Sequence, residues 1–164
     1  SSNGYETRLL ASVHEVNEVQ KRRLAEKIKT WLGPNLSNVR IGVWGLAFKR
    51  DTDDTRESPA VVLVDALLKE GAAVQAFDPA AMAAVDEYWE GGVVGCARMY
   101  DAAVGVDALA VMTDWQEFRL PNWAKVRKLM KGNMVFDGRN LYEPAVLERE
   151  GLVHIGIGRG QPSS

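Results

Sequence analysis

Two loops of this sequence carry cationic side chains that could bind a phosphate group. The first loop contains Phe48, Lys49 and Arg56 and runs into a Ser-Pro pair that predicts the start of a helix. The N-terminus of a helix carries partial positive charge and free N–H groups, both suited to phosphate. In the second loop Arg139 follows Gly138, so a ligand could approach the backbone while the guanidinium donates two parallel bonds. These residue types predict recognition of a nucleotide.

Each of these signals also has a plainer structural interpretation. Residues 49–57 hold three basic and four acidic side chains, so a self-paired, solvated turn is an equally good interpretation. Gly42 and Gly45 lack the G-x-G-x-x-G spacing of a dinucleotide fingerprint, and we expect them to serve close packing. Asp78 could hold a ribose, but it lies too far beyond these glycines, and an Asp-Pro turn is favoured.

The remaining reactive side chains do not form a recognisable site. Cys96 has no neighbouring histidine or cationic helix start that would lower its pKa, which predicts an inert thiol. His14 and His154 are far apart and provide no metal-ligand spacing, so we expect no metal. The two histidines and the five tryptophans are interpreted as packing or surface residues.

Composition limits the class of protein further. A chain of 164 residues with 46% hydrophobic content can bury one core, which predicts a single compact domain. The net charge of −2 offers no field of one sign, so neither nucleic acid nor an anionic membrane surface is an expected partner. No run approaches the roughly 18 apolar residues of a membrane span and no leader is recognised, so a cytoplasmic location is expected.

Hydrophobic periodicity predicts an alternating series of helices and strands. Such alternation is typical of an α/β fold with a Rossmann-like parallel sheet and helices on both faces. Residues 91–99 have no clear pattern. The predicted elements are a long N-terminal helix over 5–32, strand 39–46, helix 58–70, strand 74–77, helix 80–89, helix 100–104, strand 107–112, helix 123–130, strand 134–136, helix 144–150 and strand 152–157.

The first helix is longer than one small domain needs for its own packing. Apolar side chains recur every three or four residues from Leu9 to Trp31, and the helix would be roughly 40 Å long. Gly33-Pro34 ends it. We therefore expect a dimerisation helix over 1–33, a nucleotide-binding domain over 34–158 and a disordered tail over 159–164.

Three segments together resemble the UDP-glucose/GDP-mannose dehydrogenase family. Gly45-Leu46-Ala47-Phe48-Lys49 with residues 52–59 (TDDTRESP) is similar to the first motif of its C-terminal domain. Phe136 to Tyr142 (FDGRNLY) is similar to a later motif of the UDP-glucose branch. Leu9-Leu10 and Val16-Asn17-Glu18 resemble the central helix of the family, so the likeness spans nearly the whole chain.

The resemblance implies a role for each candidate residue. In that family an N-terminal Rossmann domain binds NAD, the central helix builds a homodimer, and the C-terminal domain binds the UDP part of the substrate. By resemblance Phe48 and Lys49 contact the nucleotide, Arg139 reaches the UDP-sugar, and Arg56 extends toward NAD held mainly by the other domain.

The same resemblance implies an activity that this chain does not perform alone. The family oxidises the primary alcohol of UDP-glucose to UDP-glucuronate with two NAD, through a thiohemiacetal on a cysteine that no residue here matches. We therefore expect no catalytic residue in this chain. Two alternatives stay open, a dimerisation scaffold and the same portion of a GDP-mannose or UDP-N-acetyl-sugar dehydrogenase. A free-standing NAD enzyme is disfavoured, because fingerprint and base–nucleophile pair are both lacking.

Overall fold

Six short strands alternate with helices along the chain. The computed structural model describes residues 22–157. A helix over residues 22–32 comes first. The elements that follow are β1 (Arg40–Trp44), α2 (Pro59–Lys69), β2 (Ala73–Phe77), α3 (Ala83–Trp89), β3 (Val93–Gly95), the 3₁₀ helix η1 (Tyr100–Ala103), β4 (Ala108–Val111), α4 (Gln116–Arg119), α5 (Trp123–Leu129), β5 (Met134–Asp137), α6 (Pro144–Arg149) and β6 (Val153–Gly156).

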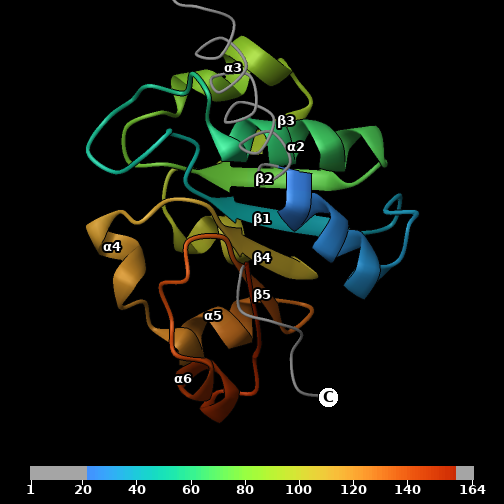
Figure 1. Ribbon diagram of the computed structural model, residues 1–164, viewed down its shortest axis with the longest axis vertical. Helices are drawn as coiled ribbons and strands as arrows, with labels where there is room; N and C mark the ends of the chain where they lie inside the picture. The colour runs from blue at the N-terminus through green and yellow to red at the C-terminus, as the bar shows by residue number, and fades with distance from the viewer. Residues whose placement is uncertain (1–21, 158–164) are drawn as a thin grey trace, which may run out of the picture.

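The strands form one parallel sheet in the order β3-β2-β1-β4-β5-β6 (Figure 1). The chain leaves β1 outward to β2 and β3, and then crosses back to place β4 on the other side of β1. The strand order therefore reverses between β1 and β4, and in such folds ligands bind beyond the carboxyl ends of the strands near this point. The predicted α/β, Rossmann-like class is confirmed.

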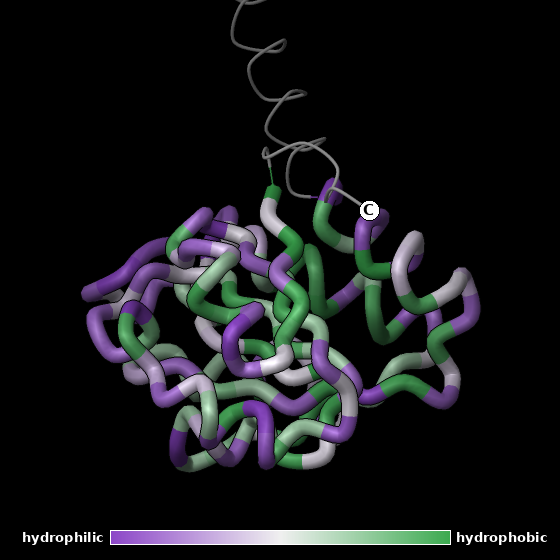
Figure 2. Tube along the Cα trace, turned by 90° about the horizontal axis from the view of Figure 1, so that it is seen from below, coloured by the Kyte–Doolittle hydropathy of each residue, from purple (hydrophilic) through white to green (hydrophobic). Residues whose placement is uncertain are grey.

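Helices cover both faces of the sheet and enclose two hydrophobic cores. The helix 22–32, α2 and α3 pack on one face, where Leu63, Val64 and Leu67 of α2 are buried against β1 and β2. The 3₁₀ helix, α4, α5 and α6 pack on the other face around Trp44 and Phe118. Figure 2 shows hydrophobic residues running through the middle of the molecule while hydrophilic residues gather in the outer loops. Strands buried on both faces explain the apolar runs in the sequence.

Alternation along β1 fixes what each face receives. Ile41 and Val43 enter the first core, and Trp44 enters the second and donates from Nε1 to the carbonyl of Met99 at 2.7 Å. A Cβ on Gly42 would lie 2.2 Å from the carbonyl oxygen of Ala102, so glycine allows the 3₁₀ helix to approach the strand. The predicted packing role of Gly42 is confirmed.

Two short elements were not predicted, and the start of α3 differs from its prediction. The 91–99 segment contains β3 at the sheet edge, where Val94 is 63% exposed. A strand of three residues is too short to give a periodic signal. The single turn α4 is shorter than a helical pattern can reveal. α3 begins at Ala83 rather than at residue 80, because residues 78–81 form a turn around Asp78.

The described part of the first helix belongs to the first core. Leu24 and Ile28 are fully buried, and Lys27 Nζ donates to the carbonyl of Gly156 at the end of β6. The helix ends at residue 32, where Gly33 adopts a φ of 101° as the Gly-Pro pair predicts. The rest of the predicted 5–32 helix and the 159–164 tail lie outside the described residues, so the domain division remains a prediction. Within 22–157 no helix is long and apolar enough to cross a membrane.

Candidate functional site at the carboxyl edge of the sheet

The loop after β1 is folded around a buried carboxylate. Asp78 is 1% exposed, and its Oδ2 accepts from the backbone N–H groups of Leu46 and Ala47 at 2.7 and 3.0 Å. Its Oδ1 accepts from Ala80 and Ala81 at 2.8 Å each. A carboxylate used in this way has no room for a ribose, so the interpretation of Asp78 as a turn residue is confirmed.

Gly45 is required where this loop leaves the strand. Its φ of 98° lies in the left-handed region, and a Cβ there would lie 2.1 Å from Oγ1 of Thr113. Thr113 follows β4, is fully buried, and its hydroxyl has no hydrogen-bond partner. The loops of β1 and β4 are thus in direct contact at the point where the strand order reverses.

The loop then presents Phe48 and Lys49 to solvent. Phe48 is 45% exposed, although its backbone N–H is fixed by the carbonyl of Asp54 at 2.7 Å. Lys49 is exposed and forms no ion pair with any residue of the described chain. An aromatic ring and an unpaired ammonium side by side suit the base and phosphate of a nucleotide.

The other cations of this loop are paired. Arg56 holds Asp54 with two side-chain bonds of 3.0 and 2.9 Å, and Arg50 lies 3.8 Å from both Asp51 and Asp114. The hydrogen bond from Arg56 lowers the pKa of the Asp54 carboxyl to about 2. The self-paired interpretation of residues 49–57 therefore holds for these two arginines and not for Lys49.

The start of α2 differs from the expectation of free N–H groups. Ser58 is 1% exposed and caps the helix, its Oγ accepting from the N–H of Ala60 at 3.2 Å. The same hydroxyl donates to the carbonyl of Leu46 at 2.8 Å. The prediction of free N–H groups at this helix start is therefore wrong for Ala60, because the serine cap occupies a donor that a phosphate would need.

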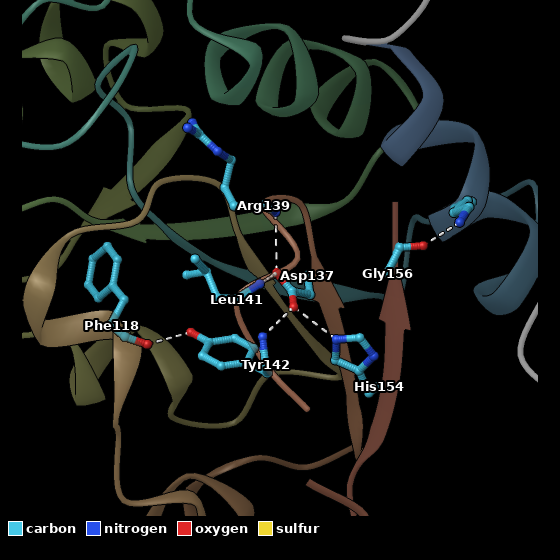
Figure 3. A network of polar contacts seen from close by, with 8 residues as sticks. Phe118, Asp137, Arg139, Leu141, Tyr142, His154 and Gly156 are labelled. Carbon is cyan, nitrogen blue, oxygen red and sulfur yellow. Dashed lines mark hydrogen bonds and ion pairs between the residues drawn. The ribbon is translucent and has the colours of Figure 1, made fainter. Parts of the chain in front are cut away.

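The turn after β5 is built around a second buried carboxylate, Asp137. Its Oδ1 accepts from the N–H groups of Arg139 and Leu141 at 3.2 and 3.0 Å. Its Oδ2 accepts from the N–H of Tyr142 at 3.0 Å and from Nε2 of His154 at 2.9 Å. In Figure 3 the guanidinium of Arg139 points away from this network, and within residues 22–157 it forms no ion pair.

The pKa values of Asp137 and Tyr142 are both shifted in this buried network. Burial alone would raise the pKa of Asp137, but the hydrogen bonds from His154, Leu141 and Tyr142 outweigh it and lower the pKa. Burial and the nearby Asp137 charge raise the pKa of Tyr142, whose hydroxyl donates to the carbonyl of Phe118 at 2.6 Å. Asp137 is therefore an anion at neutral pH while Tyr142 stays neutral.

The fold brings the predicted residues to one edge. Phe48 and Lys49 follow β1, Arg139 follows β5, and β4 lies between those strands, so the strand ends are roughly 10 Å apart. Arg56 lies further along the β1 loop, exposed and held by Asp54. The non-glycine residues with positive φ in the described chain, Asp51, Glu57 and Asn140, all lie in these two loops. Strained backbone of this kind concentrates at functional sites.

This edge does not fit the pyrophosphate of NAD. The turn after β1 lacks the three-glycine fingerprint, and 14 residues separate Trp44 from α2, where a dinucleotide fold places one tight turn. The first N–H of that helix turn is already capped by Ser58. The described residues thus offer no dinucleotide site of their own.

Sequence reasoning missed the residues that support this edge. His154, expected to be a packing or surface residue, is buried against Asp137 because its position in β6 lies next to β5. Trp115 donates from Nε1 to Asp78 at 3.3 Å. Both contacts join segments far apart in sequence, and only the strand order reveals them.

Cys96 agrees with its prediction as an inert thiol, since burial raises the pKa of its thiol.

Comparisons with known proteins give the family. Residues 42–144 match the UDP-glucose/GDP-mannose dehydrogenase family, UDP binding domain. The chain is 40% identical to a UDP-glucose 6-dehydrogenase of Pseudomonas aeruginosa over 162 residues, which cover 95% of this chain and 36% of that protein.

Solved structures agree. A UDP-glucose dehydrogenase from Pyrobaculum islandicum superposes with a TM-score of 0.76 at 28% identity, covering 92% of this chain and 32% of that one. A UDP-D-ManNAc dehydrogenase from Pyrococcus horikoshii gives 0.65 at 31% identity, covering 85% and 30%. The present chain spans about a third of the length of the relatives it matches.

The strand order and the loops at its carboxyl edge define a doubly wound α/β domain of the nucleotide-binding class. Within that class, the chain belongs to the UDP-glucose/GDP-mannose dehydrogenase family and corresponds to its UDP-binding domain. Its homologues are oxidoreductases.

Proposed function

We propose that this chain binds the UDP part of UDP-glucose at the carboxyl edge of its sheet. Phe48 and Lys49 contact the nucleotide, and Arg139 reaches the phosphates or the sugar from the other side of β4. The observation that supports this most strongly is that Lys49 and Arg139 form no ion pair within residues 22–157, whereas the neighbouring Arg50 and Arg56 both have acidic partners. Cations that are not already paired can neutralise a diphosphate without losing an existing ion pair.

The whole protein, on this proposal, is an NAD-dependent UDP-glucose 6-dehydrogenase that forms UDP-glucuronate for polysaccharide biosynthesis in the cytoplasm. The relatives named UDP-glucose 6-dehydrogenase support it. NAD is held mainly by a domain that this chain does not contain, and Arg56 extends toward it after releasing Asp54. When bound there, NAD accepts the hydride, and the residues described here only bind and orient the nucleotide. The protein is a homodimer through the 5–32 helix.

Titration calorimetry with UDP, UDP-glucose, GDP and NAD at moderate salt tests the binding site. We expect UDP and UDP-glucose to bind, with Lys49→Ala and Arg139→Ala each weakening the affinity about tenfold, the effect of losing one charge-assisted bond. Arg50→Ala is the matched control, since it removes an equal charge from the same loop and should leave the affinity within about twofold.

Two outcomes would change the assignment. Unchanged UDP affinity in both Lys49→Ala and Arg139→Ala would disprove the site. Preference for GDP would favour the same portion of a GDP-mannose dehydrogenase. Tighter binding of UDP-N-acetyl sugars would favour the branch of the Pyrococcus horikoshii UDP-D-ManNAc dehydrogenase. If no nucleotide bound, the chain would be better described as a dimerisation scaffold.

A further inference from the structure

We propose that His154 is a positioning residue for the nucleotide site, acting through Asp137 on the turn that carries Arg139. The identity of the ligand as a nucleoside diphosphate depends on the proposed function above. His154 itself lies beyond residues 42–144, the part that matches the family's UDP-binding domain. It does not touch the ligand; its ring fixes the carboxylate around which the turn folds.

The Asp137 carboxylate accepts four hydrogen bonds, which are divided evenly between its two oxygens. Each oxygen accepts two hydrogen bonds, Oδ1 from Arg139 and Leu141, and Oδ2 from Tyr142 and His154. The side chains of His154 and Asp137 are 3% and 0% exposed, so water cannot replace a lost donor without a rearrangement. Figure 3 shows the four bonds converging on one carboxylate.

His154 differs from the other three donors in where it comes from. The N–H groups of Arg139, Leu141 and Tyr142 belong to the turn itself, so they move with it. His154 belongs to β6, where it pairs in register with Val135 of β5. Because this strand is part of the sheet, the imidazole is the one donor in the set that ties the Asp137 carboxylate to a rigid element outside its own turn.

The proton on this ring is assigned by chemistry. An ionised carboxylate only accepts hydrogen bonds, so Nε2 of His154 must carry the hydrogen that Asp137 receives. Both the neutral Nε2–H tautomer and the imidazolium satisfy this requirement. The bond is therefore kept whichever of these two forms the ring adopts.

The tip of the turn adopts a left-handed backbone conformation. Asn140, directly after Arg139, has a φ of 55°, which asparagine adopts more readily than most residues do. The far end is fixed by the Tyr142 hydroxyl on the Phe118 carbonyl. Arg139 thus lies between one anchor on α4 and another on β6, and loss of the β6 anchor would let the carboxylate rotate and the guanidinium spread over many positions.

The test combines UDP titration with a double-mutant cycle. His154→Leu removes the donor at similar volume and should weaken UDP binding by up to about tenfold, the full effect of Arg139→Ala, because the guanidinium would no longer be held in place. Arg139→Ala should then add little in the His154→Leu background, whereas Lys49→Ala should still add its full effect. His154→Gln keeps an N–H of similar reach and should restore affinity to within about threefold.

A matched control separates positioning from general destabilisation. Ile155→Val alters the next residue of β6, whose side chain is buried on the opposite face in the other core. It should lower the melting temperature without changing UDP affinity. If it weakened UDP binding as much as His154→Leu, or if His154→Leu left the affinity unchanged, the positioning role would be overturned.

Amide hydrogen exchange tests the role of His154 independently of UDP binding. If the wild-type chain bound no UDP, the proposed function would fail, yet exchange at Leu141 and Tyr142 would still report on the tether. We expect faster exchange at both amides in His154→Leu than in wild type, and unchanged protection would overturn the proposal. Should His154→Leu not fold, His154→Asn, whose shorter amide falls short of Asp137, replaces it.

Discussion

Two buried aspartates organise the carboxyl edge, and they do so in different ways. Asp78, directly after β2, and Asp137, the last residue of β5, are 1% and 0% exposed and lie on opposite sides of the switch point between β1 and β4. Asp78 joins two loops about 30 residues apart in sequence, since it accepts from Leu46 and Ala47 as well as from its own turn. Asp137 mainly folds the turn that follows it, with His154 as its external support.

The difference separates a fixed half of the edge from an adjustable one. All five donors on Asp78 are N–H groups that keep their hydrogen at any ordinary pH, four from the backbone and one from the Trp115 indole. The turn at Asp137 has its tip in solvent and depends on one side-chain donor from another strand. One candidate cation, Lys49, thus follows a loop fixed by buried donors, and the other, Arg139, lies on an exposed turn with a single donor from outside it.

The largest expected effect contrasts the two carboxylates directly. Asp78→Asn should lower the free energy of unfolding by about 3 kcal/mol, because its amide N–H₂ would face donors of buried residues. Leu46 and Ala47 are 0% and 1% exposed, so their freed N–H groups cannot reach water. Asp137→Asn should cost less, about 2 kcal/mol, because the exposed tip of its turn can rearrange.

Urea denaturation of both variants measures this contrast. The midpoints should shift while the m-values stay constant, which would assign the change to stability rather than to the extent of unfolding. A larger loss in Asp137→Asn than in Asp78→Asn would contradict the division into a fixed and an adjustable half.

Acid should weaken the Asp137 half. The folded pKa of Asp137 is lowered, so its stabilising contribution is complete above the unfolded value of about 3.9 and is lost as the pH falls toward the folded pKa. The titration of one group can change the free energy of unfolding by at most about 1.4 kcal/mol per pH unit. The unfolding free energies of wild type and Asp137→Asn, measured between about pH 5 and about pH 2, should therefore converge as the pH drops. Parallel curves would show that Asp137 is not the titrating group.

The smallest effect concerns the strained tip. Asn140→Gly should stabilise the chain by a few tenths of a kcal/mol up to about 1, while Asn140→Ala should destabilise it by about 1, because alanine resists the left-handed conformation. Thermal melts of the two variants compare them. Equal melting temperatures would mean that the turn relaxes to another conformation and that Asn140 carries no strain.

Much of the fold was predictable, because apolar runs bounded by glycine and proline give the strands and the helices between them. The sheet class, the α2 start at Ser58-Pro59 and the helix end at Gly33 followed from local physics. β3 and α4 were not predictable, because β3 is a three-residue strand in a glycine-rich segment and α4 is a single helical turn, too short to show the helical period of about 3.6 residues.

The site was predictable only in its exposed parts. Phe48, Lys49 and Arg139 stand out as residue types that suit a nucleotide, and the structure places them on one edge. Whether each cation is paired could not be predicted, because Arg50 finds Asp114 in a loop from another strand. His154 was unpredictable for the same reason: its partner lies 17 residues away, on a neighbouring strand.

The bond between Lys27 and the carbonyl of Gly156 has a consequence for how the chain folds during synthesis. Its two residues are 129 positions apart, so the helix over 22–32 cannot complete this contact until β6 has left the ribosome. At about 5–20 residues per second, that interval is on the order of ten seconds. During this time Leu24 and Ile28 lack the strands β5 and β6 that complete their core, and the nascent chain presents an apolar surface that a chaperone could protect.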